Sequence, residues 1–401
     1  MSVVPAELFH SSSDEQLKRN PSRASAWFRK YMMEGQHLDD LAASQLQKLA
    51  EKPSLPDLIL IKYRKYTAML VPFLLIQAVW WSSATKFDWF RWYPDYWHMP
   101  VTMLLGSFVA GITSEGSGAV AFPVMTLALH LNPQVARDFS IMIQSVGSTA
   151  ACVCVFFMKV RVESRAIVLG TIGCIPGFIL GVHFIDPLFN AHEKKMLFVS
   201  IWTAFAAALA YLNASKRSTY DQIPDFKAWK AVVLLVTGFV GGVFDAFAGS
   251  GIDICIFSII TLLFRVSEKT ATPTTVCLKG INAIFGFYYR AVMMGDIEDT
   301  AVRYFLCSIP VASFMAPAGS LIGSHLHRQV VAAFVYILEL AALIGFLFTK
   351  PELVLIVIGA LIIAGGFIFF HFVSKAGERL MDRIEQKKGL PQQQSNETTV
   401  Y

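Results

Sequence analysis

Charged residues are scarce in this chain. Only 16% of its 401 residues are Asp, Glu, Lys or Arg, whereas 55% are hydrophobic. A soluble domain carries about 25% charged residues, so this chain has too few to cover a surface that faces water. Apolar runs close to the ~20 residues that cross a bilayer recur from residue 66 to residue 374. The composition therefore predicts an all-α polytopic membrane protein. The alternating ~10-residue segments of a membrane β-barrel are missing.

The sequence also lacks the motifs of the common enzyme classes. It has no Walker A loop, no G-x-S-x-G elbow, no H-E-x-x-H and no dinucleotide fingerprint. None of the six cysteines forms a C-x-x-C pair or a zinc-spaced cluster with histidine. We therefore expect no catalytic activity, no cofactor and no bound metal. The net charge of +5 sits mostly in loops and tails, which favours a lipid surface and no nucleic-acid partner.

Two related halves form the expected core, a first repeat at 100–213 and a second at 230–348. Each opens with two short apolar stretches separated by a glycine-containing break, and three fuller segments follow. An offset of 133 residues places Gly116-Ser117-Gly118 on Gly249-Ser250-Gly251. The short stretches are 100–113 and 117–131 in the first half, and 231–246 and 251–264 in the second.

The flanking parts are expected to add membrane segments and polar tails. The polar residues 1–65 predict a cytoplasmic tail without a cleavable signal peptide. An extra transmembrane helix and an outer aromatic loop occupy 66–99, and a last transmembrane helix occupies 353–374. A basic cytoplasmic tail follows at 375–401.

Each repeat crosses the membrane an odd number of times, whether its short pair spans the bilayer or enters and returns. The second repeat therefore starts from the opposite side, which predicts two inverted repeats with interrupted or re-entrant short helices, a plan common among secondary transporters. With the N-terminus inside, ten basic residues fall in inner loops and six in outer loops. The positive-inside rule thus predicts that both termini are cytoplasmic, and we expect the plasma membrane.

The two breaks are candidate binding sites. Irregular backbone at membrane depth must be covered by protein or line a wet cavity, because each unpaired polar group costs several kcal/mol in lipid. A helix that begins after a break offers free N–H groups to an anion. The substrate-binding candidates are therefore Gly116, Ser117, Gly118, Gly249, Ser250 and Gly251. The alternative is close helix packing, which we favour for Gly173, Gly177, Gly181, Gly319 and Gly323.

Lys279 lies near the middle of an apolar segment, where a lysine costs ~2.5–3.5 kcal/mol to insert. Asn282 follows on the same helical face, and both are candidates for contact with the substrate. The alternative is that Lys279 forms a structural pair with a carboxylate. Four carboxyl groups are candidates for proton coupling, and packing between helices is the alternative for Glu339: Glu115, Asp245, Asp253 and Glu339.

Several stretches resemble the sulfite exporter TauE/SafE family over roughly 100–348. In the first half the resemblance rests on Gly106 to Gly111, the Gly116-Ser117-Gly118 break, Pro123, and Asn132 to Ala136 with Ser140. In the second half it rests on Thr237 to Gly251, Thr270 to Thr275, and Lys279-Gly280. The chain departs from the family where Glu115 and Ser117 replace glycine, and where Asp245 and Asp253 add negative charge near the second break.

The resemblance implies a secondary transporter of a small anion, a sulfur oxyanion or organosulfonate such as sulfite, that works by alternating access. The expected partners are this anion and the lipid bilayer, and protons are the candidate coupling ion. The sequence does not indicate the oligomeric state. Two alternatives remain open: a membrane scaffold or receptor without transport, and an anion channel.

Overall fold

The computed structural model describes residues 27, 61, 63–214 and 219–388. Seven helices in this described part are long and apolar enough to cross a membrane, and it contains no strand. The prediction of an all-α polytopic membrane protein is therefore confirmed. The predicted N-terminal tail lies almost wholly outside the described residues, as do residues 389–401 of the C-terminal tail.

The helices are given in chain order, and η denotes a short 3₁₀ or π segment. They are α4 (Arg64–Phe87), η4 (Trp89–Trp92), α5 (Tyr93–Tyr96), α6 (His98–Ile112), α7 (Gly118–Pro123), η5 (Val124–Ala128), α8 (Pro133–Phe157), α9 (Ser164–Leu180), η6 (Gly181–Ile185) and η7 (Asp186–Leu188). They continue with α10 (Ala191–Ala214), α11 (Ala228–Ala248), α12 (Ile252–Ser258), η8 (Ile259–Leu263), α13 (Glu268–Tyr288), η9 (Tyr289–Met294), α14 (Asp299–Gly323), α15 (Arg328–Phe348) and α16 (Leu353–Lys388).

Helix α11 is longer than the sequence predicted. It has 21 residues and qualifies as a membrane span, so the expectation of a short stretch at 231–246 was wrong. The cause lies at Lys230, which is only 1% exposed. Its ammonium group donates to the carbonyl of Pro224 and lies 5.5 Å from the ring centroid of Trp229 and 5.4 Å from that of Phe264. Because this charge is satisfied inside the protein, the helix can include Lys230 and begins at Ala228.

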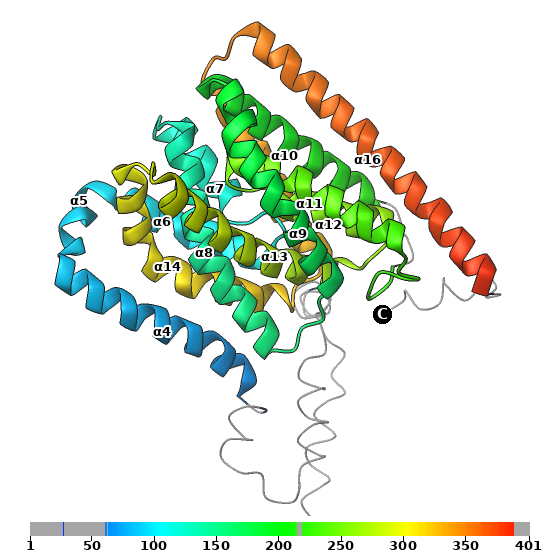
Figure 1. Ribbon diagram of the computed structural model, residues 1–401, viewed down its shortest axis with the longest axis horizontal. Helices are drawn as coiled ribbons and strands as arrows, with labels where there is room; N and C mark the ends of the chain where they lie inside the picture. Colours follow the sequence, from blue (N-terminus) through cyan, green and yellow to red (C-terminus); the bar gives the residue numbers. More distant parts are fainter. Residues whose placement is uncertain (1–26, 28–60, 62, 215–218, 389–401) are drawn as a thin grey trace, which may run out of the picture.

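Helix α16 also passes its expected end at residue 374. It runs unbroken for 36 residues, about 54 Å, along one edge of the bundle (Figure 1). The basic stretch that was expected to be a tail starts as helix, because Gly377 packs against the backbone of η8 and Arg265 donates to the carbonyl of Ser374 at 3.1 Å.

Two parallel helix pairs frame the core. Helix α6 runs alongside α14, and α11 runs alongside α9. A methyl group at Gly319 would overlap the backbone of α6, and one at Gly173 would overlap the backbone of α11. The close packing predicted for the glycines of α9, η6 and α14 is thus confirmed.

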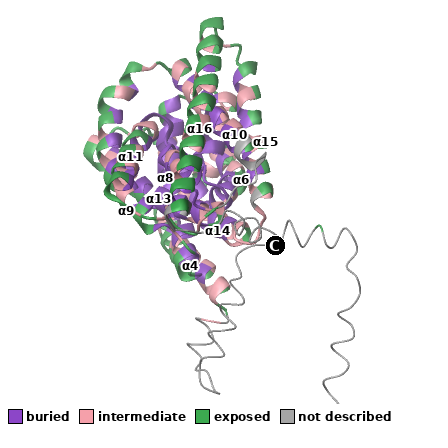
Figure 2. Ribbon diagram, turned by 90° about the vertical axis from the view of Figure 1, so that its right-hand side faces the viewer, coloured by how far each residue is buried: buried purple, intermediate pink, exposed green. Residues whose placement is uncertain are grey.

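Two further helix pairs in the core are α8 with α13 and α10 with α15. Every one of these four pairs joins a helix of the first predicted repeat to a helix of the second. In chain order, α6, α8, α9 and α10 of the first repeat correspond to α11, α13, α14 and α15 of the second. When each helix is replaced by its counterpart, the same four pairs result, as an inverted repeat requires. The inverted repeat itself stays a prediction. Buried residues fill the centre, whereas exposed residues cover the outer faces of α4 and α16 (Figure 2).

The bundle has two ends, which we call the N-side and the far side. The N-side is where α4 begins, since Lys65 Nζ lies 3.3 Å from His325 Nε2 just after α14. Val155, near the end of α8, lines the same cavity as Leu326, so α8 also ends at the N-side. The far side holds the start of α8, which is 25 residues or about 37 Å long.

Candidate functional site

Two breaks in the helices form the centre of the candidate site. The first break is Thr113–Ser117, between α6 and α7, and the second is Gly249–Gly251, between α11 and α12. Gly116 and Gly249 have φ angles of +72° and +70°, in the left-handed region that favours glycine. Each break is therefore a sharp reversal of the chain that most other residues would strain.

The two breaks touch each other. Ser250 Oγ lies 3.0 Å from the carbonyl oxygen of Glu115, and a Cβ on Gly118 would lie 3.0 Å from the Cβ of Ser250. Gln144 of α8 supports the contact, because its Nε2 donates to the carbonyl of Gly249 at 2.8 Å. The candidate residues of the two halves are thus brought into one buried cluster. The hydroxyl of Ser117 has no hydrogen-bond partner among the described residues.

Lys279 of α13 is held at the second break by three side chains. Its Nζ donates to Ser250 Oγ at 2.6 Å and forms ion pairs with Asp253 at 3.0 Å and Asp245 at 3.3 Å. The lysine is 3% exposed and the aspartates 1% and 7%. This geometry matches the alternative in which Lys279 pairs with Asp245 or Asp253.

The ion-paired triad of Lys279, Asp245 and Asp253 carries a formal charge of −1 when all three groups are ionised. The same aspartates also accept hydrogen bonds from backbone N–H groups at the start of α12, at 3.5 Å from Ile252 and 3.0 Å from Ile254. The protein's own carboxylates therefore occupy donors that an anion would use. An incoming anion must displace a carboxylate or arrive with a compensating positive charge.

Asn282 lies one helical turn beyond Lys279. Its Nδ2 donates to Thr171 Oγ1 at 3.1 Å and to the carbonyl of Leu278 at 2.8 Å, while its Oδ1 has no partner among the described residues. Asn282, Lys279 and Asp245 line a small cavity of about 220 Å³. The cavity places a free amide oxygen beside the ion-paired triad.

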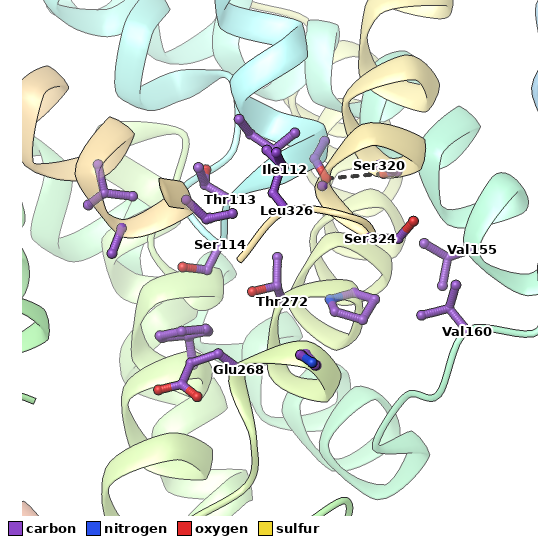
Figure 3. Close-up of a pocket in the computed structure, with 18 of the residues that line it drawn as sticks. Ile112, Thr113, Ser114, Val155, Val160, Glu268, Thr272, Ser320, Ser324 and Leu326 are labelled. Carbon is purple, nitrogen blue, oxygen red and sulfur yellow. Dashed lines mark hydrogen bonds between the residues drawn. The ribbon is translucent and has the colours of Figure 1, made fainter. Parts of the chain in front are cut away.

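A larger cavity, which we call the vestibule, opens at the N-side. Its volume is about 850 Å³, and Figure 3 shows its side chains coming from the end of α6, from α13 and from the end of α14. Thr113 and Ser114 of the first break line it, and so does Val335 of α15. The vestibule thus connects the N-side with the first break.

Glu115 and Glu339 meet next to the vestibule. Glu115 follows Ser114 in the chain, and Glu339 lies one helical turn after Val335. The two carboxyl groups lie close enough to interact electrostatically, and they are 0% and 1% exposed. None of their four oxygens receives a donor from the rest of the described protein.

A network of ion pairs, buried except at Asp296, lies at the far side. Arg137 of α8 pairs with Asp186 at 2.7 Å and with Asp138 at 2.9 Å, and its Nη1 also reaches the carbonyl of Ala246 at 3.4 Å. The far-side network is completed by Asp186–Lys194 at 2.7 Å, Arg290–Asp138 at 2.9 Å and Arg290–Asp296 at 2.7 Å. Its six charges balance, so this network holds α8, α10 and η9 together over the second break.

Sequence reasoning missed Gln144 and the far-side network. Gln144 was detectable as a lone amide inside an apolar segment, where a buried polar group needs a partner. Arg137 was counted among the six basic residues of the outer loops, and Arg290 was placed at the edge of the acidic loop that contains Asp296. Their 2% and 3% exposure shows that both are buried instead.

Comparison with known proteins gave one match. The family described as Sulfite exporter TauE/SafE matches residues 99–346 of the chain. That span contains both breaks, the ion-paired triad, Glu115 and Glu339. No curated protein and no solved structure matches the chain.

Proposed function

The chain belongs to the sulfite exporter TauE/SafE family, and on that premise we propose that it is a secondary transporter of a small sulfur oxyanion or organosulfonate, such as sulfite. The contact between the two breaks carries this proposal. Ser250 Oγ lies within hydrogen-bond distance of the first break and of Lys279, which joins the two predicted repeats at a buried cation. Transporters built from inverted repeats place their substrate at such a junction.

The chemistry of the breaks suits an oxyanion. Lys279 and the hydroxyls of Ser250 and Ser117 supply donors, and the glycines let the ligand approach the backbone closely. In this proposal the anion takes the place of one carboxylate as a partner of Lys279. Asn282, at the adjacent small cavity, helps to orient it.

Access to the site favours a carrier over a channel. The vestibule reaches the first break from the N-side, while the far-side network ties the helices together at the opposite end. A cavity that is open at one end and sealed at the other is the arrangement that alternating access needs. The excess of basic residues in the predicted inner loops supports a cytoplasmic N-side in the plasma membrane.

Removal of the Ser250 hydroxyl tests the proposal. Because a hydrogen bond to a charged group contributes about 1.5–3 kcal/mol, S250A is expected to lower sulfite uptake into proteoliposomes by about tenfold or more. The matched control is S258A, which removes another buried hydroxyl from α12 away from both breaks. We expect S258A to transport sulfite like the wild type. Equal uptake by S250A and S258A would remove the second break from the transport site.

A further inference from the structure

The Glu115–Glu339 pair has an electrostatic problem that the protein does not solve by itself. Two ionised carboxylates in contact repel each other, and burial removes the water that would screen them. Each oxygen of an ionised carboxylate is an acceptor only, so the two groups can hydrogen-bond to each other only when one of them is protonated. The described residues offer no donor to any of the four oxygens.

The surrounding charges do not relieve this pair. Asp253 lies close to the first break, because its Oδ2 would be 3.1 Å from a Cβ on Gly116, and its negative charge adds to the repulsion. Lys279, the buried cation of α13, is already held by Asp253 and Asp245. From α8, the neutral Gln144 lies beside Gly116. Glu268 and Lys269 line the vestibule but form no ion pair with Glu115 or Glu339.

We infer that the Glu115–Glu339 pair is a proton-binding site, loaded from the vestibule, which makes anion entry depend on proton uptake. When the pair holds one proton, that proton lies between the two carboxyl groups and the pair has a charge of −1. A second proton from the vestibule makes the pair neutral. The proton is later released to the opposite side as the site changes its access.

The charge balance gives the direction of coupling. The ion-paired triad carries −1 and the singly protonated pair carries −1, so a monovalent anion that enters would meet two negative charges in a dry interior. Neutralising the pair removes one of them. The proton and the anion therefore cross in the same direction. This inference rests on the proposed function and names its coupling ion.

The test uses the purified full chain in liposomes with sulfite as the probe and the membrane voltage clamped. Two quantities are measured: sulfite exchange at equal pH on both sides, and sulfite accumulation driven by an imposed pH gradient. The wild type is expected to show both. E339Q and E115Q keep the shape of the side chain. E339Q is expected to keep exchange within about threefold and to lose accumulation, and E115Q is expected to lose accumulation. The control is E352Q, which alters an exposed glutamate before α16 and is expected to behave as the wild type.

The possible outcomes separate this inference from the proposed function. Accumulation that persists in both E339Q and E115Q at the wild-type level would overturn the proton site and leave transport standing. Accumulation that follows a sodium gradient instead of a pH gradient would do the same, because it would assign the pair to a metal cation. Absence of sulfite exchange in the folded wild type would overturn the proposed function and this inference together. Loss of accumulation with retained exchange in either variant, with an unchanged melting temperature, supports the proton site.

Discussion

A lysine and two aspartates account for most of the electrostatics of the site. Lys279 is stable in the interior because both aspartates and a serine hydroxyl surround its ammonium group. Removal of one partner from a buried pair leaves an uncompensated charge, which is more harmful than removal of both. The residue is therefore needed for stability as well as for the proposed anion contact, and a test must separate the two roles.

A comparison of a single variant with a double variant separates the two roles. K279M is expected to lower the free energy of unfolding in mixed micelles by about 3–5 kcal/mol, because Asp245 and Asp253 stay buried without their cation. The double variant K279M/D253N removes one of the two charges and is expected to recover part of that loss. Unfolding is followed by circular dichroism. Anion transport is expected to be absent from both variants.

The control for this comparison is K86M, which removes an exposed lysine at the end of α4. It is expected to change the free energy of unfolding by about 0.5 kcal/mol or less. If K279M/D253N were no more stable than K279M, the ion-paired triad would not be the source of the stabilisation.

Single charges were the most predictable part of the site. Lys279, Asp245 and Asp253 stand out because each interrupts or borders an apolar run, where its insertion is costly and needs a reason. The contact between Glu115 and Glu339 was not predictable. Both were proton candidates on separate grounds, and their pairing depends on how α15 packs against α7. Sequence periodicity places a residue on one face of a helix, but it does not determine which other helix packs against that face.

At the scale of elements, the two breaks set the geometry of the candidate site. The second break reverses the chain at Gly249, whose carbonyl is held by Gln144. A Cβ at Gly249 would lie 2.6 Å from the carbonyl oxygen of Arg137 and 2.9 Å from the Cβ of Ser140. The break is thus fitted tightly against the start of α8, next to the far-side network.

Alanine substitution at two glycines separates conformational strain from this close fit. Gly249 and Gly295 both have positive φ, at +70° and +67°, but a Cβ on Gly295 would have no neighbour within 4 Å. G295A is expected to lose only the ~1–2 kcal/mol of left-handed strain and to keep sulfite transport. G249A is expected to lose more stability, because it also displaces backbone of α8, and to lose transport. Thermal melting and proteoliposome uptake measure the two effects. Equal behaviour of the two variants would contradict the close fit.

Helix type was predictable from the sequence, and some helix ends were not. Apolar run lengths predicted the short helices α6, α7 and α12 and the longer segments after them, since each run must satisfy its backbone within the membrane, but they failed for α11. The ends of α11 and α16 differed because charged residues there are accommodated in the helix. Lys230 is buried against Pro224, Trp229 and Phe264, a tertiary contact that no local pattern of hydropathy contains.

At the scale of the whole molecule, the vestibule and the far-side network lie at opposite ends of α8. The pairs α6–α14, α11–α9, α8–α13 and α10–α15 all cross between the predicted repeats. A rocking of one half against the other would open one end while it closes the other. The ion pairs of Arg137 and Arg290 would then have to break, and the vestibule would have to narrow around Thr113 and Ser114.

Counterflow of labelled sulfite tests the central claim, that the chain is a carrier with a site between the two breaks. Proteoliposomes are loaded with a high concentration of unlabelled sulfite and diluted into a trace of labelled sulfite, with the voltage held at zero. A carrier exchanges one anion for another, so the account predicts a transient internal accumulation of label that is lost in S250A and kept in S258A. Accumulation that is absent from the wild type would contradict the account. A current that follows voltage without saturation would then indicate a channel, and no flux at all would indicate a scaffold or receptor.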